Sequence, residues 1–427
     1  MPTTNQKQQR LLLLREIAER QNRYRYVEWL RCGDIDVDAI MSHQTIQRKI
    51  RSIEASRYLN GKRGPYRAGG AIAEMRRDLD DSPGCWLKPQ EFKEKYGMLR
   101  ESFWKLVEMI RHNPVFHRKK GSRGRKQVKP EFQLMVLLAF LRTEGSGMNN
   151  RKGRNLFSIG QGSVAKYRDR AVQAILEELY HDTVFWPDTE ERKDISKRFV
   201  EKYPTFPNLV GIADGTLFPL AFRPQRSDFP DYHGRKHLYS LTCLIINDDK
   251  RRIRYFNAGW AGTTHDDRVF SNAAICKRSE QFFDPKQYLL GDSAYSPRPY
   301  VVSAFKKPIG GVIGRDRELF NTKMSKPRVT SEHTIGMLKG RWPFLRSIRF
   351  QLTEEKSTLE TIIKYISVCV VLHNILIGFD DELEEYDWDD DISEIDADNE
   401  LNQPLHPLAC ADARRTQLLN YMLENFD

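Results

Sequence analysis

Two patterns of hydrophobic and polar residues follow one another along the chain. From about residue 88 to 200, apolar residues recur at helical spacing, with the charged residues between them. From about residue 205, short apolar runs rich in β-branched residues alternate with helical stretches. This change of pattern predicts a helical domain followed by an α/β domain.

The short apolar runs predict four strands, over residues 209–213, 239–246, 252–262 and 287–292. The polar residues Asn247 to Lys250 supply a turn between the second and third strands. Helices are expected around 266–280, 297–307 and 328–347, the last one beginning near Pro327 or Ser331. Three strands in a meander, a helix, a strand and a helix predict a mixed sheet.

The predicted elements divide the chain into four parts. Residues 1–87 form a helical and partly disordered region, 88–204 a helical domain, 205–379 the α/β domain, and 380–427 an acidic, disordered tail with a short terminal helix. The apolar run at 365–379 contains His373 and Asn374, which predicts a buried helix with satisfied core polar groups rather than a membrane span.

Charge indicates a polyanionic partner. The net charge is +11, although residues 380–400 hold thirteen acids and no Lys or Arg, so the rest of the chain is strongly basic. Nucleic acid is the simplest such partner, and an ordinary basic protein with a solvated surface is the alternative. The six cysteines are scattered without a C-x-x-C pair, which favours reduced thiols and an intracellular protein.

Two basic segments are candidates for contacts to DNA. The run at 118–129 is predicted to be a phosphate-contacting loop or a nuclear import signal, or else an exposed solvated loop. Its candidate residues are Arg118, Lys119, Lys120, Arg123, Arg125 and Lys126.

Residues 155–179 have the pattern helix, turn at Gly160, basic helix, which is that of a helix-turn-helix. The same spacing also occurs in plain helical bundles. The second helix would bury Val164, Tyr167, Ala171, Ile175 and Leu179. It would present to DNA the residues Gln161, Ser163, Lys166, Arg168 and Arg170.

Three carboxylates are the candidates for chemistry. Asp214 in "NLVGIADGTLFPLAF" and Asp292 in "QYLLGDSAYSPRPY" each follow an apolar run and are flanked by small residues. Two such carboxylates repel unless a proton or a cation lies between them, and hard divalent cations prefer oxygen ligands. Glu332 falls on the predicted helix with Lys339 on the same face. Three carboxylates suit two-metal phosphoryl transfer, whereas aspartates that bond backbone amides are the structural alternative.

Lys339 and Arg341, near the end of the same predicted helix, would hold a phosphate beside these acids. His265 and Asp266 in "GTTHDDRVF" would line the metal site or position a phosphate. We favour the alternative in which Asp266 or Thr264 caps the start of a helix.

Five motifs occur in the order in which they are found in one family: "ADGTLFPL", "GWAGTTHDDRVF", "LLGDSAY", "RVTSEHTIGMLKGRWPFLR" and "CVVLHNIL". Over about residues 90–378 the chain resembles the PIF/Harbinger transposases, which are DDE nucleases with domesticated relatives. The resemblance implies an RNase H-like nuclease core of α/β class, preceded by a helical domain with a helix-turn-helix. It implies a D-D-E triad of Asp214, Asp292 and Glu332 that binds two Mg²⁺ ions, for which Mn²⁺ substitutes.

The function implied by this resemblance is DNA cleavage and strand joining in the nucleus. It also implies double-stranded DNA as substrate and a separate Myb-like partner protein. A homo-oligomer is a further expectation, and no membrane is expected, because no apolar stretch approaches the length of a membrane span. The alternative is a domesticated module that binds DNA or protein without cleaving. A nuclease of similar fold that acts on RNA or junctions is a third interpretation.

Overall fold

The computed structural model describes residues 11–20, 46–48, 50–51, 54, 72–82, 85–117, 127–144, 150–234, 237–307, 311–381 and 409–426. The chain divides into two compact units, Met1–Ala73 and Glu74–Asp427. In the first unit, residues 11–20 are helical, and Arg15 forms an ion pair with Glu54 at 2.7 Å. The second unit contains all the predicted chemistry.

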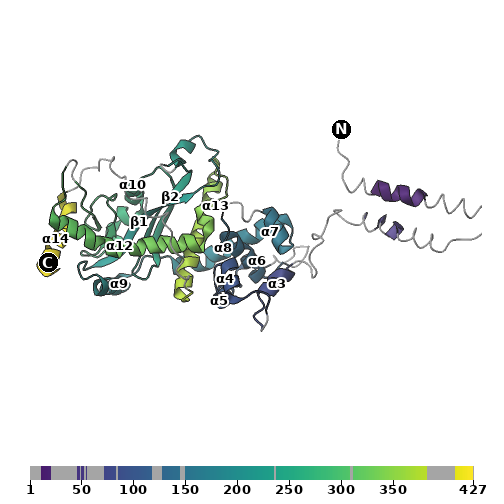
Figure 1. The fold of residues 1–427 in the computed structure, drawn as a ribbon, viewed down its shortest axis with the longest axis horizontal. Coiled ribbons are helices and arrows are strands. Elements are labelled where there is room, and N and C mark those ends of the chain that lie inside the picture. The colour runs from purple at the N-terminus through teal and green to yellow at the C-terminus, as the bar shows by residue number, and fades with distance from the viewer. Residues whose placement is uncertain are drawn as a thin grey trace, which may run out of the picture. The chain divides into compact units, whose positions relative to one another are not determined.

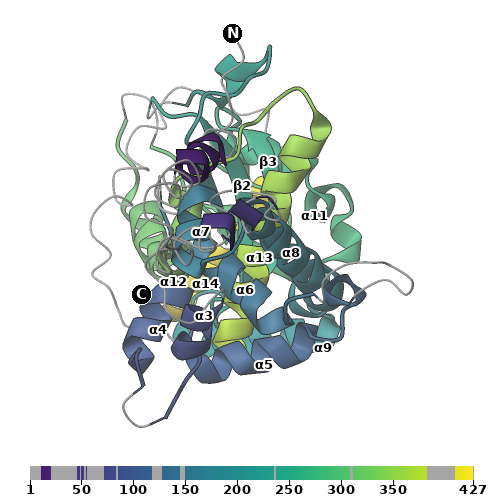
Figure 2. The same ribbon diagram turned by 90° about the vertical axis from the view of Figure 1, so that its right-hand side faces the viewer.

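The first part of the second unit is a helical block, as the spacing of its apolar residues predicts. Its helices are α3 (Ala73–Asp78), α4 (Pro89–Tyr96), α5 (Arg100–Ile110), η1 (Pro114–Phe116), α6 (Pro130–Leu141), α7 (Asn150–Phe157), α8 (Gln161–Thr183) and α9 (Thr189–Lys202). Helix α6 is apolar on every side and is buried from Phe132 to Leu141, so it forms the centre of the block. Helix α8 packs between α6 and α13 (Lys356–Gly378), and Figure 2 shows α8 and α13 side by side.

Helix α13 is long and apolar enough to span a membrane by composition, but 72% of its apolar window is buried inside the protein. The imidazole of His373 bonds the carbonyl of Arg251 at 3.0 Å. The Asn374 side chain accepts from the amide of Ile253 and donates to the carbonyls of Ile253 and Thr183. The prediction of a buried core helix with satisfied polar groups is therefore confirmed.

Five strands among the described residues form one mixed sheet in the order β3-β2-β1-β4-β5. They are β1 (Leu209–Pro219), β2 (Ser240–Asn247), β3 (Ile253–Ala261), β4 (Tyr288–Gly291) and β5 (Val301–Ser303). The pairs β1–β2 and β2–β3 are antiparallel, and β1–β4 and β4–β5 are parallel. The mixed α/β class is thus confirmed, and this strand order fits an RNase H-like core.

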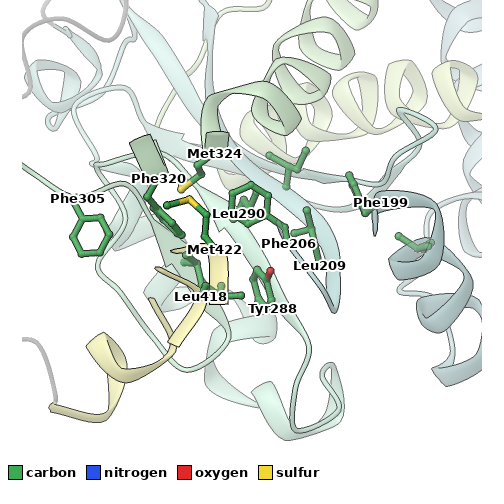
Figure 3. Close-up of a cluster of buried hydrophobic side chains, with 13 residues drawn as sticks. Phe199, Phe206, Leu209, Tyr288, Leu290, Phe305, Phe320, Met324, Leu418 and Met422 are labelled. Atoms are coloured by element: carbon green, nitrogen blue, oxygen red, sulfur yellow. The ribbon is translucent and has the colours of Figure 1, made fainter. Parts of the chain in front are cut away.

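Each face of the sheet has its own hydrophobic core. On one face, Ile212 of β1 and Leu290 of β4 join a cluster with Phe199 of α9, Phe320 and Met324 of α12 (Arg315–Arg341) and Leu418 and Met422 of α14 (Ala409–Phe426) (Figure 3). Figure 1 shows α12 lying across this face of the sheet, with α14 beside its beginning.

On the opposite face, Val210, Ala213 and Leu289 pack with Val269 and Phe270. The latter two belong to α10 (Asp266–Asn272), which is followed by α11 (Ala274–Lys277) and η3 (Ser279–Gln281). Both faces of β1 and β4 are covered, which explains their nearly continuous apolar runs.

Two predicted elements were wrong. The helix expected over 297–307 is instead strand β5, whose Val301 and Val302 are fully buried opposite Leu289 and Leu290. Pro297 and Pro299 precede it and disfavour a helix, and a run of three apolar residues is too short for its periodicity to be informative.

The helix expected to begin near Pro327 or Ser331 begins at Arg315, so that Pro327 lies inside it. Proline removes one intrahelical hydrogen bond. The helix stays continuous because it is packed on both sides of the proline. Phe320 and Met324 are buried before it, and Ile335 and Leu338 are buried after it. Tertiary burial therefore overrides the local signal.

The end of the chain belongs to the core. Helix α14 buries Leu418 and Met422, which are one turn apart, against the sheet and α12. Arg414 donates to the carbonyls of Pro285 and Lys286, just before β4. The region after residue 408 thus stabilises the face of the sheet from which Asp214 extends.

Candidate active site on the central sheet

Two aspartates occupy matching positions, one on β1 and the other directly after the neighbouring parallel strand β4. Strands β1 and β4 pair with Ile212 opposite Leu290, and Asp214 and Asp292 each lie two residues further on. Ile212 and Leu290 share one hydrophobic cluster, so strand alternation directs Asp214 toward the face covered by α12, and Asp292 follows the end of β4 at the same level. Neighbouring strands lie about 4.8 Å apart, so the structure brings these two predicted carboxylates together.

Local hydrogen bonds hold both aspartates in place. The carboxylate of Asp214 accepts from the amide of Gly215 at 2.9 Å, and that of Asp292 accepts from the amide of Ala294 at 2.9 Å. Asp292 is 7% exposed and Asp214 is half-buried. Two carboxylates this close are stable when a cation or a proton offsets their repulsion.

A third aspartate approaches the same point of β1 from the other face. Helix α10 begins at Asp266, with His265 as its N-cap and no side-chain hydrogen bond at the cap. The expected helix start is present, with His265 in the N-cap position, and capping by Asp266 or Thr264 stays a prediction. The carboxylate of Asp266 fills the space beside Gly215, where a Cβ atom would lie 2.1 Å from its Oδ1. The glycine after Asp214 is what allows this approach.

Tyr295 links these acids electrostatically. Its phenol is fully buried, packs against Gly291 and meets the ring of Phe270 edge-on. Burial, reinforced by the negative charges of Asp266, Asp214, Asp292 and Asp267, raises the pKa of Tyr295 well above its ordinary value. The phenol therefore stays protonated in the negative field of these acids.

A side-chain network joins α10 to the segment that follows Asp292. Asp267 accepts hydrogen bonds from the amide of Ser296 at 2.9 Å, from its hydroxyl at 3.0 Å, and from Arg298 at 2.7 Å. Arg298 also donates to the hydroxyl of Ser271 at 2.7 Å and lies over the ring of Phe270. Although burial alone would raise it, these bonds lower the pKa of Asp267 below its ordinary range.

This network was missed from sequence, because Asp267 and Arg298 are 31 residues apart and meet only in the folded chain. The doublet Asp266–Asp267 was the available signal, because adjacent residues at a helix start face different ways and can reach different partners.

Glu332 lies on α12, the helix that covers the face of the aspartates. Met324 joins the same cluster as Ile212, and Lys339 lies over the ring of Phe218 at 5.7 Å, so α12 runs along β1 in the same direction. Glu332 falls between these two contacts, but Ser331 is the buried residue of that turn and Glu332 is exposed. Within the described ranges, no three Asp, Glu, His or Cys side chains are close enough to hold a metal ion. Participation of Glu332 stays a prediction.

Arg341 does not reach DNA, contrary to the prediction. It is 2% exposed and donates to the carbonyl of Gly97 at 2.9 Å and to the carbonyl of Asp381. Its guanidinium lies 3.6 Å from the Asp381 carboxylate, and burial lowers the pKa of Arg341 to about 10. Arg341 therefore connects the end of α12 to the helical block. Lys339 is half-buried and directed toward β1.

Arg168 is a second correction. It is 7% exposed and lies 4.1 Å from the centre of the Phe140 ring, because α8 turns this side toward α6. Lys166 on the same helix is exposed. Helices α7 and α8 are joined by only residues 158–160, and Val164, Ala171, Ile175 and Leu179 are buried as predicted. The basic residues Arg118, Lys119, Lys120, Arg123, Arg125 and Lys126 lie outside the described residues.

Comparison with known proteins identifies the domain that carries the aspartates. Residues 213–374 match the family described as DDE superfamily endonuclease. The chain is 24% identical over 310 residues to "Protein ALP1-like" of Arabidopsis thaliana, which covers 69% of this chain and 72% of that protein. It is 24% identical over 282 residues to "Putative nuclease HARBI1" of Homo sapiens, covering 66% of this chain and 75% of that protein.

A bacterial relative extends the comparison. "Probable transposase for insertion sequence element IS702" of Microchaete diplosiphon is 22% identical over 258 residues, which is 59% of this chain and 84% of that protein. No solved structure shows a significant match. The matched segment contains Asp214, Asp266, Asp292 and Glu332. The resemblance inferred from the five motifs is confirmed at the level of the domain, because residues 213–374 match the DDE superfamily endonuclease family.

Proposed function

We propose that this protein is a metal-dependent DNA endonuclease and strand transferase of the PIF/Harbinger type. The observation that carries the proposal is the matched placement, in a DDE endonuclease domain, of Asp214 on β1 and of Asp292 directly after the adjacent parallel strand β4. The comparisons support an endonuclease, and the extension to strand transfer rests on the resemblance to transposases.

The donor set fits a divalent cation, because two neighbouring carboxylates offer hard oxygen ligands and repel each other without one. Asp214 and Asp292 would hold Mg²⁺, or Mn²⁺ in its place, as one or two ions. When bound, such an ion stabilises negative charge that develops on the phosphate in the transition state. Glu332 would complete the set by turning inward from its exposed position on α12.

Other side chains prepare the site. The clamp formed by Asp267, Ser296 and Arg298 holds the segment after Asp292 against α10. The buried ring of Tyr295 excludes water beneath the aspartates. Lys339, beside Phe218, would contact a phosphate oxygen while water attacks the phosphodiester; a freed 3′-hydroxyl would then attack a second one in strand transfer.

We further propose how the DNA is held. Helices α7 and α8, with the exposed Lys166, would act as a helix-turn-helix, and the basic segment 118–129 would contact phosphates or direct the protein to the nucleus. A Myb-like partner protein and assembly into a homo-oligomer belong to the same proposal, on the strength of the family resemblance.

Cleavage of a labelled DNA duplex tests the proposal. The full chain is incubated with Mg²⁺ or Mn²⁺, with and without EDTA, beside the variants Asp292→Asn and Asp194→Asn. Asp194 is an exposed acid on α9 that pairs with Lys197 at 3.0 Å, so its variant is the matched control. We expect metal-dependent nicking by the wild type and the control, and background cleavage by Asp292→Asn.

The second candidate function is a domesticated module that binds DNA or protein without cleaving. The exposure of Glu332 and the lack of a three-carboxylate cluster within the described residues favour it. A folded wild-type protein that fails to nick DNA, even when a Myb-like partner is supplied, would select this alternative.

A further inference from the structure

Beyond the end of β1 the chain forms a short parallel ribbon with the segment that precedes α13. Residues 220–225 pair with residues 348–353 through the bridges Leu220–Ile348 and Gln225–Thr353. The amide of Ala221 donates to the carbonyl of Ile348 at 2.9 Å, and that of Gln225 to Leu352 at 2.7 Å. We call these two segments the arginine ribbon. Its backbone bonds give its side chains defined positions.

Arginines on the ribbon are held against aromatic rings. The guanidinium of Arg349 lies 5.1 Å from the centre of the Phe222 ring, and that of Arg223 lies 3.7 Å from the centre of the Phe229 ring. Phe222 is 39% exposed, and both arginines are exposed. A guanidinium that stacks on a ring by its face keeps its N–H groups free to donate hydrogen bonds, and their spacing allows two parallel bonds to a phosphate.

The charge of these arginines is not neutralised locally. Neither Arg223 nor Arg349 makes an ion pair within the described part of the chain. The nearby acids are engaged elsewhere: Asp228 receives two bonds from Arg226, at 2.7 and 2.8 Å, and Glu354 accepts from the amide of Ser227 at 2.7 Å. The ribbon therefore presents two preorganised cations that form no ion pair with a described residue.

The ribbon continues the strand that carries Asp214. Phe222 follows Asp214 by eight residues, so at about 3.3 Å per residue the two are at most about 26 Å apart. Between them, Lys339 lies over Phe218. Hydrogen bonds connect the loop after the ribbon to the segment before α10. The carbonyl of Asp231 accepts from both the amide and the hydroxyl of Thr263, which lies three residues before Asp266.

We propose that the arginine ribbon binds the phosphate backbone of duplex DNA that flanks the bond to be cleaved. This inference rests on the proposed function, because it takes DNA as the substrate. A reach of at most about 26 Å spans about seven or eight base pairs at 3.4 Å each. The bond to be cleaved would lie at the aspartates, and the flanking phosphates would lie at the two arginines.

Binding of a fluorescent 30-base-pair duplex of arbitrary sequence tests the inference. Anisotropy is measured at several salt concentrations in EDTA, where no metal-dependent cleavage occurs. Each lost phosphate contact should reduce the slope of the logarithm of the association constant against the logarithm of salt concentration by about 0.9. At 0.1 M salt this corresponds to a loss of affinity of about eightfold. We expect Arg349→Ala and Arg223→Ala each to show this loss, and the double variant to show both.

The matched control is Arg317→Ala. Arg317 is also exposed and lies 5.1 Å from the ring centre of Phe305, but it is in the first turn of α12, about 22 Å along the helix from Glu332. We expect its affinity and salt slope to equal those of the wild type. Circular dichroism shows whether each variant remains folded.

The outcomes separate the two proposals. If the ribbon variants bind DNA as the wild type does, or if Arg317→Ala weakens binding equally, the ribbon is not a DNA surface, whether or not the protein cleaves. If the ribbon variants lose affinity while the wild type never nicks DNA, the ribbon inference stands and the nuclease proposal fails.

Discussion

Arg298 is the side chain whose removal tests the architecture of the site most directly. It bonds Asp267 at 2.7 Å, the hydroxyl of Ser271 at 2.7 Å and the carbonyl of Ser296 at 3.0 Å, and it lies over Phe270. Arg298→Met keeps an apolar stem on the ring and removes the three hydrogen bonds.

The expected cost follows from these contacts. A hydrogen bond to a charged group contributes about 1.5–3 kcal/mol, and breaking a buried ion pair costs about 3–5 kcal/mol when the remaining charge is left without partners. Asp267 keeps both bonds from Ser296, and its side chain is 20% exposed, so the full cost does not apply. We expect the free energy of unfolding to fall by about 2–3 kcal/mol.

The pH dependence gives an independent check. The pKa of Asp267 is lowered from 3.8 in the folded protein, against the effect of burial, by its bonds to Arg298 and Ser296. Its contribution to stability is therefore complete above about pH 4 and is lost as the pH falls through the folded-state pKa. The stability difference between wild type and Arg298→Met should be full at pH 7 and should shrink below about pH 4.

Urea denaturation at pH 7 and at a series of lower pH values measures both effects. Arg278→Met, at an exposed arginine after α11, is the control and should stay within about 0.5 kcal/mol of the wild type. Because the clamp joins α10 to the segment after Asp292, Arg298→Met should also need more Mn²⁺ for half-maximal nicking. Wild-type stability in Arg298→Met, or a difference that stays constant with pH, would refute the clamp.

Three further predictions concern other parts of the site and its support. Gly215→Ala places a methyl group 2.1 Å from Asp266 Oδ1 and should abolish nicking without unfolding the protein. The cleavage assay measures the nicking, and circular dichroism shows whether the variant is folded. Arg341→Leu removes the donor to the carbonyls of Gly97 and Asp381, while the Asp381 carboxylate keeps Lys93 at 3.4 Å and the amide of Leu99 at 2.7 Å. The free energy of unfolding should therefore fall by about 2–3 kcal/mol in urea. The DNA salt slope should not change, and a decrease near 0.9 would contradict our assignment. Burial lowers the pKa of His373 from 6.5 to about 4, so the unfolded state takes up the proton first as the pH falls. The free energy of unfolding should therefore fall by up to about 3 kcal/mol from pH 6.5 to 4. His373→Gln should reduce this fall in urea denaturation at a series of pH values, and an unchanged pH dependence would contradict the assignment.

Local sequence determined the elements whose signals are strong and short in range. The apolar runs located four strands of the sheet, and the helical spacing in α8 identified its buried face, because alternation and periodicity reflect burial directly. The small residues around Asp214 and Asp292 indicated that each carboxylate has space beside it for a ligand. Motif order was enough to identify the endonuclease domain, which the family match confirms.

Tertiary structure alone decided which charges face the solvent and which acids meet. Arg168 and Arg341 looked like DNA contacts in a basic sequence, but packing against Phe140 and Asp381 buries them. The short apolar run did not identify strand β5, which forms because Val301 and Val302 pair with a buried strand. Asp266 approaches Gly215, and Asp267 meets Arg298, through contacts between segments far apart in sequence. Periodicity describes one element at a time, whereas these contacts depend on how two elements pack, which is why only the folded chain shows them.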